Sequence, residues 1–279
     1  MSNTKRVGIQ HLVDLSPTKA NAFLKTIIQC NKLIGTLKID GVGFRFGKDA
    51  DGRKFVESSY SGVIYNPNDF VEYAKANNKD MRIATAYKDL SLLLFKSKVM
   101  SRINNNTKIV CEVLYEGLNQ SSNLHTVKNV HLEYDKSLLS KKGLAVFIIT
   151  ELNFTTGATS ITGTYHDLSD EYVTVYDKTY VVPTSHNNAD DLFNMIKHHL
   201  TTYKDLIDFK TKAAQSLKPA YVSSLKDISN LIYAMSKDQL GSITALSKTV
   251  EGFVFNDVKV VDPSFKQMIA DKRAKSKGV

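Results

Sequence analysis

The sequence predicts an α+β fold, built mainly of antiparallel strands and interrupted by a helical block near residues 187–240. Stretches rich in β-branched and aromatic residues recur along the chain, which is typical of strands. Turn-forming residues lie between several of these stretches. Within the block, apolar residues recur about every three to four positions, which is typical of helices.

Helix and strand signals follow one another along the whole chain. The first helix is expected to begin at Ser16-Pro17, because proline is favoured in the first turn. A hairpin is predicted over residues 36–65, with K-D-A-D-G-R-K as its turn. Helices should follow the N-P-N-D turn at residues 66–69 and cover residues 90–103. Further strands are predicted over residues 108–115, 127–134, 143–152, 160–165, 172–182 and 248–261.

Composition limits the class of protein. The chain has 279 residues, of which 42% are hydrophobic and 23% charged, as in ordinary globular proteins. It contains no long apolar run and no apolar signal segment near its N-terminus, so we expect neither a membrane span nor secretion. Cys30 and Cys111 show no metal-binding spacing. Reduced thiols and a cytoplasmic location (the host cytoplasm if the chain is viral) are therefore expected.

The net charge of +9 favours a polyanionic partner such as nucleic acid, although many basic proteins bind nothing of the kind. The charge is concentrated at the C-terminus, where residues 266–279 carry five Lys or Arg. We expect this segment to be a flexible basic tail that contacts phosphates without reading sequence.

A lysine and a carboxylate lie close together in T-L-K-I-D-G-V-G-F-R-F-G at residues 36–47. The alternation predicts one strand on which Lys38 and Asp40 share a face. Gly41 and Gly43 follow, where a side chain would obstruct a ligand or another strand. Such a pair is found at nucleophile sites and in surface salt bridges. The short motif alone favours the second interpretation, because it is common by chance.

Charged residues also occur inside later apolar strands. E-G-F-V-F at residues 251–255 places Glu251 on a face with two phenylalanines, where a charge is costly without a partner or metal. Lys259 lies among β-branched residues, where a lysine either snorkels or faces a phosphate. Glu112 occupies a third such strand. Phe147, by itself, is more typical of core packing.

In this order, the motifs resemble those of the covalent nucleotidyltransferase superfamily, which comprises ATP-dependent DNA ligases, RNA ligases and mRNA capping enzymes. K-I-D-G at 38–41 resembles its first motif, and E-G-F-V-F at 251–255 its fourth. C-E-V-L-Y at 111–115, A-V-F-I-I at 145–149 and V-K-V-V at 258–261 are similar to others. S-S-Y-S-G at 58–62 is similar to a stretch that follows the first motif in RNA ligases.

The resemblance implies an ATP-grasp-like nucleotidyltransferase fold, with antiparallel sheets around a nucleotide cleft. The domain would span residues 1–265, with the helical insertion at about 187–240 and the basic tail at 266–279. No OB domain is expected, because the 18 residues after Val261 fall far short of the roughly hundred that such a domain needs.

The resemblance also implies a chemistry. Lys38 would attack the α-phosphate of ATP, forming lysyl-AMP and releasing pyrophosphate, and Glu251 would help to hold Mg²⁺. The AMP would pass to the 5′-phosphate of an RNA or DNA end, and a 3′-hydroxyl would then displace it. Residues that would bind the nucleotide are Asp40, Gly41, Arg45, Glu112 (near the ribose), Phe147 (stacked on the base) and Lys259 (at the α-phosphate).

The chain departs from the family pattern at two of these motifs. Gly43 stands where members often carry an arginine, with Arg45 two residues further on. Val261 stands where the fifth motif usually has a second lysine.

The closest match is a compact, phage-type ATP-dependent polynucleotide ligase, with RNA favoured over DNA. An OB-like domain, if one is needed, would come from a separate protein. Two alternatives stay open. One is a non-catalytic nucleic-acid-binding protein on a decayed nucleotidyltransferase fold. The other is a nucleotidyltransferase that acts on protein or RNA, including GTP-dependent capping.

Overall fold

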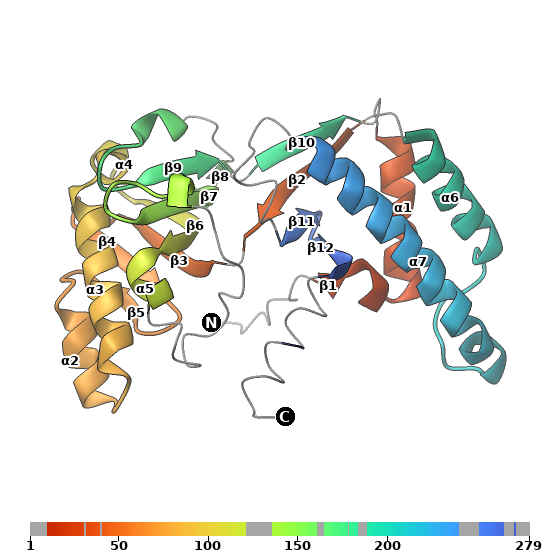
Figure 1. Cartoon of the computed structure of the whole chain (residues 1–279), viewed down its shortest axis with the longest axis horizontal. Helices are drawn as coiled ribbons and strands as arrows, with labels where there is room; N and C mark the ends of the chain where they lie inside the picture. The colour runs from red at the N-terminus through yellow and green to blue at the C-terminus, as the bar shows by residue number, and fades with distance from the viewer. Residues whose placement is uncertain are drawn as a thin grey trace. The chain divides into compact units, whose positions relative to one another are not determined.

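A computed structural model of the chain describes residues 10–30, 32–39, 41–120, 136–160, 165–177, 179–183, 189–239, 251–264 and 271 (Figure 1). The fold combines two mixed sheets with several helices, which confirms the predicted α+β class. The chain divides into two compact units. One consists of Met1–Lys38 together with Tyr180–Val279, and the other of Ile39–Thr179.

The five-stranded sheet belongs to the unit that contains Lys38, apart from the first residue of one strand. Its strands are β1 (Gln10–His11), β2 (Lys32–Lys38), β10 (Thr179–Pro183), β11 (Gly252–Phe255) and β12 (Val258–Val261), in the order β1-β12-β11-β2-β10. β1 runs parallel to β12, whereas β11 is antiparallel to both β12 and β2. The helices of this unit are η1 (Leu12–Asp14), α1 (Pro17–Gln29), α6 (Ala189–Thr202) and α7 (Lys212–Gln239).

Apolar stripes attach these helices to the unit. α1 begins after Ser16 with Pro17 in its first turn, as predicted, and buries an apolar face. α6 and α7 occupy the predicted helical block. The ring of Tyr233 on α7 lies 5.8 Å from the ring of Phe253 on β11, so α7 covers the β11–β12 hairpin on its buried face.

The second unit is built around a seven-stranded sheet. Its strands are β3 (Val42–Lys48), β4 (Lys54–Ser58), β5 (Gly62–Ile64), β6 (Thr107–Tyr115), β7 (Leu144–Asn153), β8 (Thr159–Ser160) and β9 (Thr174–Asp177). The order is β5-β4-β3-β6-β7-β8, and β9 lies parallel to β7. Its helices are α2 (Asp69–Ala76), α3 (Met81–Lys96), α4 (Lys98–Arg102), α5 (Glu116–Gln120), η3 (Lys136–Leu138) and η4 (His166–Leu168).

The two faces of this sheet differ in character. One face packs against the helices and forms a core that includes Phe44, Phe46, Ile109, Val113 and Val146 of the sheet with Leu90, Leu94 and Val99 of the helices. Because side chains alternate across a strand, the other face carries the intervening residues. These include the half-buried charges Arg45, Glu57, Lys108 and Glu112.

The single strand predicted over residues 36–47 is wrong. β2 ends at Lys38 and β3 begins at Val42, and the two strands belong to different sheets. At Gly41 a Cβ would lie 2.9 Å from the carbonyl oxygen of Val113, so the chain turns where only glycine fits closely. Asp40 lies outside the described residues, and so does its predicted shared face with Lys38.

Other predicted element boundaries also differ from those in the structure. The helix predicted over residues 90–103 is two helices, because Ser97 ends α3 and its side chain caps α4 by accepting from the Met100 amide. The strand predicted over 172–182 is divided between β9 and β10, in different sheets. Residues 127–134, most of 160–165 and all of the tail at 266–279 except Asp271 lie outside the described residues.

A fully buried histidine, His199, lies between α6 and α7. Its ring centroid is 4.8 Å from those of both Tyr203 and Tyr221. Nδ1 lies 2.8 Å from the hydroxyl of Ser224, and Nε2 has no hydrogen-bond partner among the described residues. Burial, assisted by the neighbouring His198, lowers the pKa of His199 to about 4. The imidazole is therefore neutral at pH 7.

We expect protonation of His199 to destabilise the fold. Its pKa is about 4 in the folded chain and about 6.5 in an unfolded one. The unfolded state therefore binds the proton first, and stability falls as the pH drops from about 6.5 towards 4, by ~3 kcal/mol in all. Urea unfolding at several pH values should show this loss in the wild type but not in His199→Phe. His198→Gln is the exposed control, and an identical pH slope in His199→Phe would contradict the assignment.

Candidate active site

Lys38 and Glu251 meet where β2 ends and β11 begins. The Lys38 Nζ donates to Glu251 Oε2 at 2.6 Å, and the two side chains are only 19% and 11% exposed. The main chains are also joined, because the Glu251 amide donates to the Lys38 carbonyl at 3.1 Å. A main-chain hydrogen bond and a side-chain ion pair therefore hold Lys38 and Glu251 together. Burying either charge without the other would be costly.

Gly252 explains how the strands come so close at this point. It opposes Lys38 on β2 and Val261 on β12. A Cβ at Gly252 would collide with the backbone of Val260 and Val261, so no other residue permits this approach of β12. Gly252 also places no side chain beside Lys38. The E-G pair therefore supplies both a charge and the space around it.

Lys259 lies on the same face of the sheet as Lys38. It opposes Val254 across β11–β12, and Val254 opposes Thr36 across β11–β2. Directly opposed residues share a face, and Thr36 and Lys38 are two positions apart on β2, so Lys259 lies one row from Lys38. On this face, Thr36, Lys38, Val254 and Lys259 are half-buried. On the other face, Leu37, Phe253 and Val260 are buried.

Asp262 holds the end of β12 beside Glu251. Its amide donates to the Glu251 carbonyl at 3.0 Å, and its carboxylate accepts from the hydroxyls of Tyr233, at 2.9 Å, and Ser264, at 2.6 Å. Burial raises the pKa of Asp262, but hydrogen bonds from Ser264 and Tyr233 outweigh it and hold the pKa below its usual value. Asp262 is thus an ionised, structurally engaged carboxylate next to the candidate site.

Four other residues from the motifs lie in the second unit: Gly41, Arg45, Glu112 and Phe147. Glu112 on β6 is half-buried and opposes Phe147 on β7, which opposes Tyr176 on β9. The Phe147 ring is fully buried and stacks on Tyr176, with centroids 4.9 Å apart and planes at 13°. This is the core-type packing that Phe147 alone suggested, and base stacking by Phe147 stays a prediction.

Arg45 belongs to a charge cluster that sequence reasoning missed. Its Nη1 lies 3.0 Å from Glu57 Oε1, and Lys108 Nζ lies 2.9 Å from Glu57 Oε2. All three side chains are 17–22% exposed. The register of the β3–β4 hairpin could have revealed the Arg45–Glu57 pair, because it sets the two residues directly opposite each other. Lys108 could not be found in this way, because its place depends on β6.

The described residues offer one carboxylate for Mg²⁺, Glu251, so water and substrate phosphates would have to supply the other ligands. Among the described residues, no group of three or more His, Cys, Asp or Glu could hold a metal. Mg²⁺ commonly takes one or two carboxylates and fills its other positions with water and substrate phosphates. Glu251 supplies one such carboxylate. Asp40, whose carboxylate follows Lys38 by two positions, lies outside the described residues.

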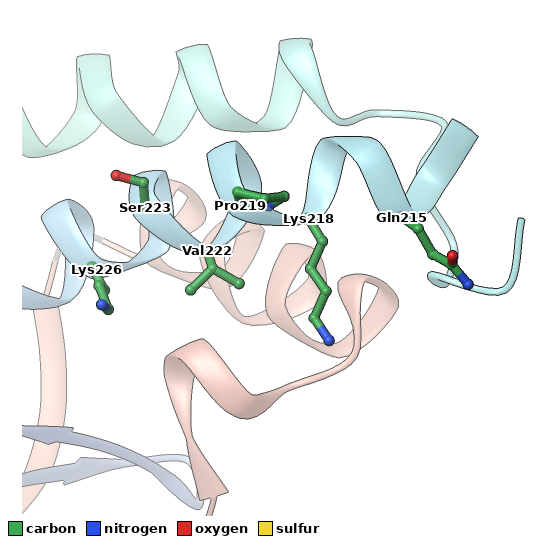
Figure 2. A pocket seen from close by; sticks show the side chains of 6 residues that line it. All are labelled: Gln215, Lys218, Pro219, Val222, Ser223 and Lys226. Carbon is green, nitrogen blue, oxygen red and sulfur yellow. The ribbon is translucent and has the colours of Figure 1, made fainter. Parts of the chain in front are cut away.

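A concave region lies on α7, lined by Gln215, Lys218, Pro219, Val222, Ser223 and Lys226. Figure 2 shows Lys218 and Val222 pointing to the same side of the helix. Pro219 lies inside α7 and cannot donate a helical hydrogen bond to Gln215. The region contains no carboxylate and none of the residues from the motifs, so it is separate from the pairing of Lys38 with Glu251.

Comparison with known proteins finds no match among family models, curated proteins or solved structures. The similarity of motifs to the nucleotidyltransferase superfamily therefore stands without a relative to support it. No helix in the described part of the chain has both the length and the apolar character needed to cross a membrane.

Proposed function

We propose that the chain is an ATP-dependent polynucleotide ligase that forms a lysyl-AMP intermediate on Lys38, with RNA ends favoured over DNA ends. The observation that carries the proposal is the contact between Lys38 and Glu251, 2.6 Å, on a sheet whose face also holds Lys259. These residues stand at the first, fourth and fifth motif positions. A purely structural salt bridge would not require a second lysine one row away.

The chemistry follows from these side chains. Lys38 Nζ would form a bond to the α-phosphorus of ATP while the bond from that phosphorus to the bridging oxygen breaks, releasing pyrophosphate. A lysine must lose its proton before it attacks. The neighbouring cations, Lys259 and Mg²⁺ when it is bound, would favour the neutral amine, and the proton would pass to water. Lys259 would offset negative charge on the α-phosphate. When bound, Mg²⁺ neutralises charge on the phosphates, and Glu251 would hold it.

The later steps rest on the resemblance. The AMP would pass to the 5′-phosphate of a nucleic-acid end, and a 3′-hydroxyl would displace it. Nucleotide binding by Gly41, Arg45, Glu112 and Phe147, and by Asp40, stays a prediction, as do the cytoplasmic location and a separate protein with an OB-like domain. The antiparallel pairing of β11 with β2 and β12, and of neighbouring strands in the series β4, β3, β6 and β7, supports the nucleotidyltransferase fold, because that family is built from antiparallel sheets.

A labelling experiment tests the proposal. The protein is incubated with Mg²⁺ and ATP or GTP labelled at the α-phosphate, and then examined for an acid-labile labelled band. We expect labelling with ATP, removal of the label by added pyrophosphate, and no labelling when the label is at the γ-phosphate. Labelling with GTP alone would point to a capping-type enzyme, and no labelling with either nucleotide would overturn the proposal.

One observation favours the second candidate, a non-catalytic nucleic-acid-binding protein. Val261, at the place of the family's second lysine, opposes Gly252, which itself opposes Lys38. An apolar residue therefore lies in the same cross-strand row as the proposed nucleophile, where the family has a cation. Binding of oligonucleotides without any labelling would favour this candidate.

Deleting residues 266–279 should weaken nucleic-acid binding and reduce its dependence on salt. Each phosphate neutralised contributes a slope of about −0.7 in log affinity against log salt on single strands, and about −0.9 on duplex. With five Lys or Arg in this segment, the slope should become shallower by about 2–3 units. Titrations at several salt concentrations measure it. Labelling should survive, because Lys38, Glu251 and Lys259 lie upstream; loss of labelling, or an unchanged slope, would contradict the prediction.

A further inference from the structure

Exposed apolar side chains gather on the charged face of the seven-stranded sheet, near β4 and the end of β7. Tyr65 is 45% exposed, Phe154 is 43% exposed and Val63 is 51% exposed. Phe55, which is buried, has its ring centroid 6.2 Å from that of each aromatic ring. Phe55 therefore packs against both Tyr65 and Phe154, which remain partly exposed to water.

The strand register explains why this cluster forms. Phe55 on β4 opposes Gly47 on β3, and Gly47 opposes Lys108 on β6. A Cβ at Gly47 would collide with the backbone of Thr107, so the middle strand carries no side chain in this row. Phe55 can therefore spread across the space above Gly47. The aromatic rings are thus held by the sheet itself.

Each exposed ring has a cation beside it. The Arg53 guanidinium carbon lies 5.0 Å from the centre of the Tyr65 ring, and Lys108 Nζ lies 5.1 Å from the centre of the Phe154 ring. Arg53 is paired with Asp49, at 2.8 Å, and with Asp51, at 3.4 Å. Arg45 and Lys108 share the one carboxylate of Glu57, so the excess of positive charge lies on the Lys108 side of the cluster. Aromatic faces flanked by cations are what single-stranded nucleic-acid binders use, with bases on the rings and phosphates at the cations.

We propose that Tyr65, Phe154, Arg53 and Lys108, together called the aromatic surface, bind single-stranded nucleic acid. Unpaired bases stack on Tyr65 and Phe154, and phosphates contact Arg53 and Lys108. The net charge of +9 favours a polyanion. A folded protein partner would need about 800 Å² of contact on this side, whereas the exposed apolar cluster contains three side chains in the described part of the chain, Val63, Tyr65 and Phe154. The proposal names a substrate contact and so rests on the proposed function.

Binding titrations of the full chain test this proposal. A fluorescent oligouridylate of about twelve nucleotides, and the matching oligothymidylate, are titrated by anisotropy at several salt concentrations. Tyr65→Ala and Phe154→Ala should each weaken binding about tenfold without changing the salt slope. Arg53→Gln should make the slope shallower by about 0.7. Asp51→Asn should tighten binding, because the exposed Asp51 carboxylate lies 3.4 Å from Arg53 and repels phosphate.

The controls separate stacking from folding. Ile207→Ala removes a 72% exposed apolar side chain from the other unit and should leave affinity unchanged. Tyr65→Leu and Phe154→Leu keep an apolar side chain without a ring, so they should weaken binding while the melting temperature stays near that of the wild type. Wild-type affinity in the Tyr65→Ala, Phe154→Ala double variant overturns the proposal. The proposal is also overturned if the double variant loses as much affinity for duplex as for single strands, because paired bases cannot stack on the rings.

Failure of the aromatic-surface proposal can be distinguished from failure of the ligase proposal. The aromatic-surface variants should still form the lysyl-nucleotide, since they leave Lys38 and Glu251 intact. Weakened oligonucleotide binding with normal labelling supports the aromatic surface. A wild-type chain that binds oligonucleotide through Tyr65 and Phe154 but is never labelled would end the ligase proposal and keep this one.

Discussion

The Lys38→Arg variant is expected to lose lysyl-nucleotide formation by more than about a thousandfold while it stays folded. Arginine keeps a cation beside Glu251, but its guanidinium does not deprotonate in proteins and cannot act as the nucleophile. Labelling with ATP carrying the label at the α-phosphate measures the loss, and urea unfolding should show stability within about 1 kcal/mol of the wild type. Labelling of Lys38→Arg at the wild-type level would show that another residue carries the nucleotide.

Arginine is a better test here than alanine. Lys38→Ala would leave the Glu251 carboxylate, which is only 11% exposed, without this cation, and would lower the free energy of unfolding by ~2 kcal/mol. A loss of labelling could then reflect a damaged fold. Lys48→Arg is the matched control, because Lys48 also lies on a strand and its Nζ donates to the Ser101 carbonyl, in the other unit. This control should label normally.

The second large effect is expected from Glu251→Gln. Glutamine keeps the shape of the side chain but loses the charge that pairs with Lys38 and that would hold Mg²⁺. Labelling should fall about a hundredfold or more, which corresponds to ~3 kcal/mol of transition-state stabilisation. It should also respond weakly when Mg²⁺ is titrated. Labelling rates at several Mg²⁺ concentrations measure both effects.

Asp262→Asn is the matched control for Glu251→Gln. Like Glu251→Gln, it replaces a carboxylate with an amide. The Asp262 main chain bonds to the Glu251 carbonyl, but the Asp262 side chain accepts from the Tyr233 hydroxyl and not from Lys38. We expect lower stability with a labelling rate within about threefold of the wild type. If Glu251→Leu raised stability and left labelling unchanged, Glu251 would be a structural residue and the site would be wrong.

Local patterns predicted several helices correctly, but they did not predict every strand boundary or which strands pair with each other. Pro17 at the start of α1 and the change of period near residue 187 are read within a few residues, and both predicted helices correctly. The break between Lys38 and Val42 was missed because alternation continues through it. Which sheet a strand joins depends on distant residues, and no local pattern contains that information.

The candidate site shows the same division. The cost of a charge in an apolar strand predicted that Glu251 needs a partner, but the partner, Lys38, lies 213 residues away. The Arg45–Glu57–Lys108 cluster was missed because it needs the register of three strands. For Phe147, its position in an apolar strand predicted core packing, and its burial and its stack on Tyr176 agree with that prediction.

The separation of β2 from β11 along the chain has a consequence for how the protein is made. Residues 39–179 are continuous and can begin to fold while later residues are still being synthesised. The unit that contains Lys38 cannot, because β2 pairs with β11 and so waits for residues 252–254 to leave the ribosome. Contacts so distant in sequence form slowly, since a long loop must close first. A nascent chain released before Glu251 would therefore contain Lys38 and β10, but neither β11 nor the carboxylate that pairs with Lys38.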